Sequence, residues 1–138
     1  MKVIYSAIFL DETTKNDLKN LAQDVFGSLY ENEKTHHITL SFGSQRTKRV
    51  GDYLDFEVIG YCKDENAQAF AVFIKDADVE NKVPHITVSH TDKVTAKYSN
   101  ELFEKSKTYA LDKQIKFRGR VGYFVRDKSE EKIVYEQV

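Results

Sequence analysis

Two short segments of the sequence repeat the same residue types in the same order. They are His37-Ile38-Thr39-Leu40-Ser41 and His85-Ile86-Thr87-Val88-Ser89. With four His and nine Thr among 138 residues, random placement predicts only about 0.3 His-x-Thr triplets. An imidazole titrates near neutral pH and a hydroxyl can donate a hydrogen bond, so each triplet can move a proton and bind an anion. The repeat therefore predicts a site for acid/base chemistry.

Both segments have the composition of β-strands, in which successive side chains point to opposite faces. The polar residues of each segment then share one face, and the aliphatic residues face the core. These polar residues are His37, Thr39 and Ser41 in the first segment and His85, Thr87 and Ser89 in the second. His36 and His90 alternate to the opposite faces, and we expect both to be structural.

Two imidazoles and two hydroxyls that face one cleft suit in-line displacement at a phosphodiester. A neutral imidazole takes the proton of an attacking water or ribose hydroxyl, and a protonated imidazole donates one to the leaving oxygen. The Thr39 and Thr87 hydroxyls would bind the non-bridging oxygens. Alternation sends the four histidines to two faces, and no Cys or carboxylate pattern adds metal ligands. We therefore expect no metal and no cofactor.

These motifs resemble the two-histidine (2H) phosphoesterase superfamily, whose signature His-x-Thr/Ser-x-hydrophobic occurs twice. The resemblance extends to the first strand (residues 5–10), which precedes an acidic residue and a helix, and to a closing hairpin (121–125 and 133–135). It implies a bilobed α+β fold in which two related, mainly antiparallel sheet halves surround a central cleft. It also implies that His37 and His85 are the acid/base pair and that Thr39 and Thr87 bind the phosphate. Which histidine is the acid stays open.

The resemblance implies hydrolysis of a nucleotide or RNA phosphodiester, most simply a 2′,3′-cyclic phosphate. One alternative is hydrolysis of a cyclic or 2′-5′-linked oligonucleotide signal, and another is a non-catalytic module that binds nucleotides or RNA ends. Tyr5, Ser41 and Ser89 are candidate substrate contacts, since Tyr5 could stack on a base. Packing explains Tyr5 equally well, and contact with water explains the two serines equally well.

The elements that must position these residues are predicted from periodicity and turn signals. Strands are expected at 3–10, 36–42, 54–63, 67–75, 83–90, 115–126 and 133–137, and helices at 12–28 and 98–111. Thr13 or Thr14 can cap the first helix. The loop 44–52 carries Arg46, Lys48 and Arg49, which we interpret as solvated rather than as a phosphate clamp. Many strands and few helices predict the α+β class.

Length and composition restrict the kind of protein. A chain of 138 residues with 41% apolar and 31% charged side chains fits one domain (1–138) with two lobes. Its 21 basic and 22 acidic residues leave a net charge of −1, which does not favour binding of long double-stranded nucleic acid. The longest apolar run, residues 69–74, is far too short for a membrane span, and the start does not resemble a secretion signal. We therefore expect a cytosolic protein.

Overall fold

The computed structural model describes residues 1–43 and 46–138, which form a mainly antiparallel sheet and a few helices. The strands are β1 (Lys2–Phe9), β2 (Asn32–Glu33), β3 (His37–Phe42), β4 (Tyr53–Lys63), β5 (Ala67–Phe73), β6 (His85–His90), β7 (Tyr109–Asp127) and β8 (Glu130–Val134). The helices are α1 (Glu12–Phe26), the 3₁₀-helix η1 (Ala96–Tyr98) and α2 (Ser99–Lys105). Every pairing between described strands is antiparallel. The predicted α+β class is confirmed.

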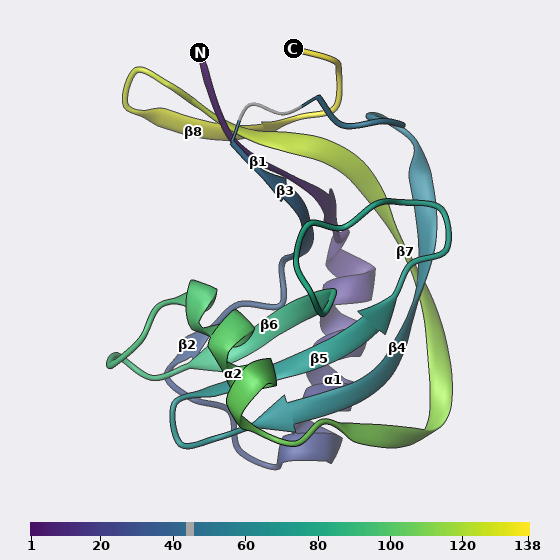
Figure 1. The fold of residues 1–138 in the computed structure, drawn as a ribbon, viewed down its shortest axis with the longest axis vertical. Coiled ribbons are helices and arrows are strands. Elements are labelled where there is room, and N and C mark those ends of the chain that lie inside the picture. The colour runs from purple at the N-terminus through teal and green to yellow at the C-terminus, as the bar shows by residue number, and fades with distance from the viewer. Residues whose placement is uncertain (44–45) are drawn as a thin grey trace.

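The two expected lobes are two halves of one sheet, with the strand order β1-β3-β6-β5-β4-β7-β8. The long strand β7 joins the halves, because its residues 109–120 pair with β4 and its residues 120–126 pair with β1. At the other side of the sheet, β3 meets β6 through the pair Ile38 and Ile86. Figure 1 shows the half with β1, β3 and β8 above the half with β5 and β6. The two motif strands therefore lie where the halves meet.

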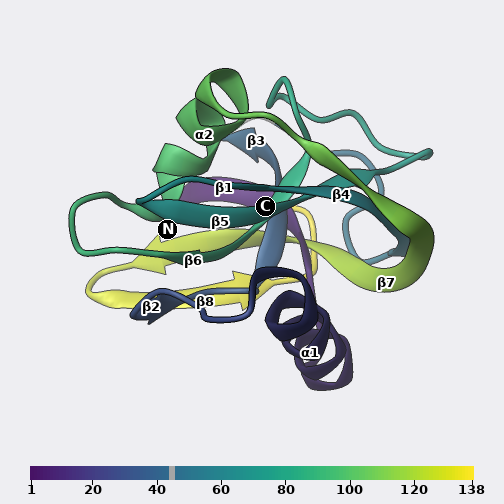
Figure 2. The same ribbon diagram turned by 90° about the horizontal axis from the view of Figure 1, so that it is seen from below.

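Helix α1 covers one face of the sheet. Asp11 caps it, since its carboxylate accepts a 2.8 Å hydrogen bond from the amide of Thr14. The helix begins at Glu12 as expected, so Thr13 and Thr14 already lie inside its first turn, and the prediction that one of them is the cap is wrong. The residues that α1 buries follow helical spacing and are Leu18, Ala22 and Phe26. Helix α2 lies on the opposite side of the strands (Figure 2). No helix in the described ranges is long and apolar enough to cross a bilayer.

Several predicted boundaries are wrong, and the pairing partners explain why. The helix expected at 98–111 ends at Lys105, because Tyr109 and its neighbour already pair with β4. Between the strands expected at 115–126 and 133–137 the chain forms a hairpin whose loop has only two residues, because Asp127 already pairs with Glu130; Lys128 in this loop has φ +60°. The loop expected at 44–52 starts with residues 44 and 45, which lie outside the described residues. Strand β2 was not predicted from its sequence.

Candidate active site

The two motifs face each other across the junction of β3 and β6. Ile38 and Ile86 form the pair that joins these strands, and both side chains are fully buried in the core. Because the strands are antiparallel, this register places His37 beside Thr87, and Thr39 beside His85, on the other face of the sheet. Each histidine therefore lies next to the threonine of the other motif.

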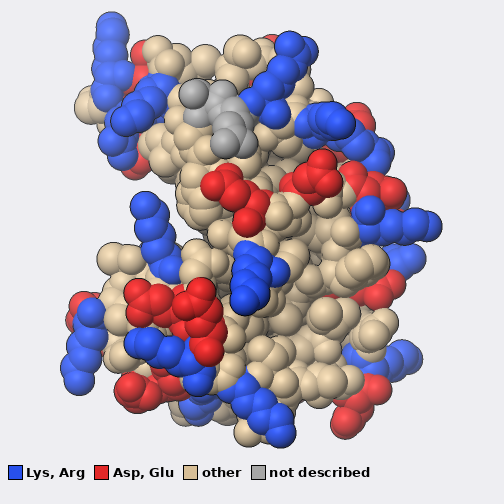
Figure 3. Space-filling view, viewed as in Figure 1, with Lys and Arg blue, Asp and Glu red and all other residues tan. Residues whose placement is uncertain are grey.

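All four motif residues line one cavity of about 660 Å³, a volume typical of sites for small ligands. Its lining also includes Ile4, Tyr5, Glu33, Lys34, His36, Phe42, Asn81, Ala96, Lys97, Asn100 and Phe124. The space-filling view shows the molecule indented between its two halves (Figure 3). On the face seen there, basic and acidic side chains are interspersed. The structure thus brings together the four residues that the sequence repeat singled out.

A β-bulge removes Ser41 from this cavity. Two successive residues of β1 pair with Thr39 and Ser41, so Leu40 between them has no partner of its own. The extra residue turns Ser41 to the opposite face, where its hydroxyl lies 2.8 Å from that of Ser6. Phe42 takes its place and lines the cavity. Ser41 was predicted as a substrate contact from strict alternation, which the bulge interrupts.

A second bulge displaces Ser89 in the same way. Successive residues of β5 pair with Ser89 and Thr87, so Val88 is the extra residue. Ser89 is fully buried; its hydroxyl donates to Gln68 and accepts from the amide of Tyr30. It does not line the cavity, and its predicted contact with substrate is wrong for this reason. Both motifs thus carry a bulge at the position after their threonine.

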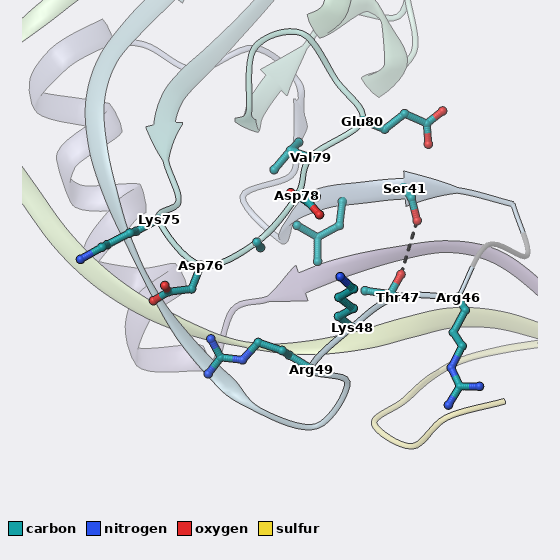
Figure 4. A pocket seen from close by; sticks show the side chains of 12 residues that line it. Ser41, Arg46, Thr47, Lys48, Arg49, Lys75, Asp76, Asp78, Val79 and Glu80 are labelled. Atoms are coloured by element: carbon teal, nitrogen blue, oxygen red, sulfur yellow. Dashed lines mark hydrogen bonds between the residues drawn. The ribbon is translucent and has the colours of Figure 1, made fainter.

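Ser41 lies instead in a second cavity, of about 620 Å³, whose walls include Arg46, Lys48 and Arg49. Its hydroxyl lies 3.4 Å from that of Thr47 (Figure 4, dashed line). The Arg46 and Arg49 side chains point in different directions in this view and do not converge on one point. Asp76, Asp78 and Glu80 line the same cavity. The three basic side chains thus share this cavity with three acidic ones, and their interpretation as solvated stays a prediction.

The geometry around His85 determines which of its nitrogens carries a proton. Its Nδ1 lies 2.7 Å from the carbonyl oxygen of Val83, which can only accept a hydrogen bond. Nδ1 therefore carries a proton, and Nε2 is the nitrogen that can exchange a proton with a substrate. Burial lowers the pKa of His85, and the hydrogen bond to Val83 partly opposes this change.

His37 has a different environment. Its ring stacks on Tyr5, with 4.8 Å between ring centroids, and its Nδ1 lies 2.9 Å from Nδ1 of His36. Burial first, and then the charges of His36 and His85, lower the pKa of His37 to about 3. The His37 imidazole is therefore neutral near pH 7 and able to take up a proton.

Tyr5 lines the cavity, and two neighbouring rings stack on its own ring. His37 stacks on it at 4.8 Å and Phe124 at 5.1 Å, with interplanar angles of 24° and 14°. A base could stack on Tyr5 only by displacing one of these rings, and contact between Tyr5 and a substrate stays a prediction. Burial first, and then the charge of Glu131, raise the pKa of Tyr5 to about 12. Its hydroxyl stays protonated and can donate a hydrogen bond.

His36 is the functional candidate that sequence reasoning missed. Alternation placed it opposite His37, yet both residues line the same cavity. Strand β3 begins at His37, and Thr35 before it has φ +52°, so strand alternation does not extend to His36. The signal available in the sequence was the pair of consecutive histidines. His90, by contrast, is buried at the end of β6 with its Nδ1 2.8 Å from the carbonyl oxygen of Thr91, as expected of a structural residue.

The two motif threonines differ in their partners. The Thr87 hydroxyl lies 2.8 Å from the hydroxyl of Ser99, which is fully buried at the start of α2. No hydrogen bond joins the Thr39 hydroxyl to another residue within 1–43 or 46–138. Lys97 and Asn100, from η1 and α2, also line the cavity. Strand periodicity could not place these residues, because they reach the cavity from a helical segment of the chain.

Within the described ranges, no group of three or more His, Cys, Asp or Glu residues is arranged to hold a metal ion. The two catalytic candidates each use Nδ1 for a hydrogen bond inside the protein, and Nε2 is the nitrogen left for a substrate. What the arrangement can do is therefore move protons. Metal-independent catalysis stays a prediction.

Comparison with known proteins adds one finding. A family model described as "Fungal tRNA ligase phosphodiesterase domain" matches residues 16–121, which is more than half of the chain. The matched range runs from α1 into β7 and contains both His-x-Thr motifs. No curated protein and no solved structure matches the chain.

Proposed function

This chain belongs to the family of fungal tRNA ligase phosphodiesterase domains, within the two-histidine phosphoesterases, and we propose that it hydrolyses a 2′,3′-cyclic phosphate at the end of an RNA without a metal ion. Family membership supports a phosphodiesterase that acts on such RNA ends. The single observation that supports the mechanism is that both His-x-Thr motifs line one cavity, on either side of the Ile38–Ile86 pair. The cytosolic location belongs to the same proposal.

His37 is the general base in this mechanism. It is neutral near pH 7, because burial and the neighbouring histidines lower its pKa to about 3. Its Nε2 removes a proton from a water molecule, and the water oxygen attacks the phosphorus. The bond from phosphorus to one ribose oxygen breaks at the same time. The proton leaves the water molecule as its oxygen attacks the phosphorus, so free hydroxide is not required as the nucleophile.

His85 is the general acid. Its protonated form donates Nδ1–H to the carbonyl of Val83, which stabilises the imidazolium, and its Nε2–H donates to the leaving ribose oxygen. The products are a phosphate monoester and a free ribose hydroxyl. After the reaction His37 releases its extra proton to solvent water, and His85 takes up a proton from solvent water.

The two threonines bind the non-bridging oxygens. The buried Ser99 hydroxyl can donate to Thr87, which then donates its own proton to the phosphate. Thr39 donates from the other side of the cavity. Hydrogen bonds aimed at these oxygens stabilise the transition state as charge redistributes around phosphorus. Lys34 and Lys97 line the same cavity and attract an anionic substrate.

A panel of substrates tests this function, with products identified by mass spectrometry. The panel contains cyclic mononucleotides, RNA with a 2′,3′-cyclic phosphate end, 2′-5′ oligoadenylate and cyclic dinucleotides. We expect turnover of the cyclic phosphate end, and a loss of about 10²- to 10⁴-fold in His37→Ala and His85→Ala. His90→Gln is the matched control, because His90 lies outside the cavity. Near-normal turnover in either Ala variant, or turnover of the oligonucleotides alone, contradicts the proposal.

A further inference from the structure

The contact between His36 and His37 restricts where protons can be. The two Nδ1 atoms lie 2.9 Å apart, and the rings are nearly perpendicular at 86°. One proton must lie between them, because two lone pairs or two N–H groups at this distance repel each other. The tautomers of the two rings are therefore linked. If the proton is on Nδ1 of His37, Nε2 of His37 has a lone pair. If the proton is on Nδ1 of His36, neutral His37 carries its own proton on Nε2.

The equivalent contact of His85 shows what this position requires. There, Nδ1 donates to the backbone carbonyl of Val83 at 2.7 Å. Each catalytic imidazole thus has one partner at Nδ1, a carbonyl in the second motif and an imidazole in the first. A carbonyl oxygen can always accept a hydrogen bond, whereas Nδ1 of an imidazole can accept one only in the tautomer that has its proton on Nε2. The role that Val83 has for His85 falls to His36 for His37.

Catalysis selects one of the two arrangements. His37 becomes an imidazolium when it takes up a proton, or starts as one if it acts as the acid, and in both cases its Nδ1 carries hydrogen. We propose that His36 is a positioning residue that accepts a hydrogen bond from Nδ1–H of His37, so that Nε2 of His37 faces the phosphorus with its lone pair. This inference rests on the proposed function, in which His37 exchanges a proton with substrate.

The backbone before His36 is held in an unfavourable conformation that brings both histidines into the cavity. Thr35 has φ +52°, which is rare for a β-branched residue. Its amide donates to the carbonyl of Thr87 at 2.8 Å, and its buried hydroxyl has no hydrogen-bond partner among the described residues. The His36 carbonyl accepts from the amide of Leu10. Strain of this kind is concentrated at functional sites.

The surroundings of His36 keep its ring neutral, as an acceptor must be. Burial lowers the pKa of His36, and the charges of Lys15 on α1 and of Lys34 add to this change, whereas Glu12 opposes it. The edge of the ring meets Phe9 at 5.7 Å and 78°, which fixes its orientation. A neutral His36 with its proton on Nε2 has the Nδ1 lone pair that His37 needs.

Two variants separate this role from simple packing. His36→Phe keeps a ring but has no acceptor, and His36→Asn places an amide oxygen near the position of Nδ1. We expect kcat to fall by about 10- to 100-fold in the Phe variant with KM within about twofold, and the Asn variant to regain most of the loss. Equal losses in the two variants, or an unchanged kcat in the Phe variant, would overturn the proposal.

The tautomer itself can be read by ¹⁵N NMR of the imidazoles, with His37→Gln used for assignment. We expect the Nδ1–H tautomer of His37 in the wild type and in His36→Asn, and a shift towards Nε2–H in His36→Phe. A wild-type His37 in the Nε2–H form would refute the proposal even if the enzyme is active. Because this measurement needs no substrate, it stays decisive if the cyclic-phosphate activity is absent.

Discussion

Burial of neutral His37 makes the stability of the fold depend on pH, in a direction that the structure specifies. An unfolded His has a pKa near 6.5, whereas that of native His37 is about 3. Between pH 7 and pH 5 the unfolded chain therefore binds a proton at this residue and the native protein does not. Because the unfolded state binds more protons, the free energy of unfolding falls as the pH falls.

The magnitude follows from the difference in bound protons. An imidazole of pKa 6.5 is about one quarter protonated at pH 7 and almost fully protonated at pH 5. Integrated over this interval, a native His37 that stays neutral corresponds to a loss of about 2 kcal/mol, which is a large part of the stability of a small domain. The lowered pKa values of His36 and His85 change stability in the same direction.

Urea unfolding followed by circular dichroism at pH 5, 6 and 7 measures this effect. The matched variant is His37→Gln, which keeps a polar side chain but has no group that titrates in this range. We expect the free energy of unfolding of the wild type to fall by about 2 kcal/mol more than that of the variant between pH 7 and pH 5. Both proteins contain the same carboxylates, most of which stay ionised between pH 7 and pH 5, so the carboxylate contribution cancels when the two proteins are compared. Equal pH dependence in the two proteins refutes the burial of a neutral imidazole at this position.

Four further measurements test the site and its support. When chemistry is rate-limiting, kcat/KM should begin to fall with rising pH at a pH below 6.5, because burial lowers the pKa of the general acid His85. Unperturbed imidazoles would give a bell-shaped profile around neutral pH, so the observed profile should be shifted towards acid. A flat profile from pH 5 to 9 contradicts this prediction. EDTA should leave the rate unchanged, and activity restored by added zinc or manganese would refute metal independence. Ser99→Ala should lower kcat by about tenfold with little change in KM, because the Thr87 hydroxyl loses its partner. A change in KM alone would argue against this role of Ser99. Gly119→Ala should lower the free energy of unfolding by about 1 to 3 kcal/mol in urea titrations, because a Cβ there would contact Ile8 and come within 2.8 Å of the Phe9 carbonyl; unchanged stability would show that the backbone can move.

The repeat in the sequence was sufficient to predict which four polar side chains line one cavity, because their orientation depends only on local periodicity. His37, Thr39, His85 and Thr87 share one face of their strands for the same reason that the intervening isoleucines face the core. Fold class followed from counting strand and helix patterns. Alternation failed one residue beyond each threonine, where a bulge adds an unpaired residue, and at His36, where Thr35 adopts φ +52°.

What the sequence determined by itself is therefore which residues could do the chemistry and which face of each strand they occupy. What only the tertiary structure decided is what these residues contact: the rings that stack on Tyr5, the carbonyl at Nδ1 of His85, and the second imidazole at Nδ1 of His37. The physical reason is distance along the chain. The face of a strand residue repeats every two residues, whereas bulges and ring contacts depend on partner strands far away in sequence.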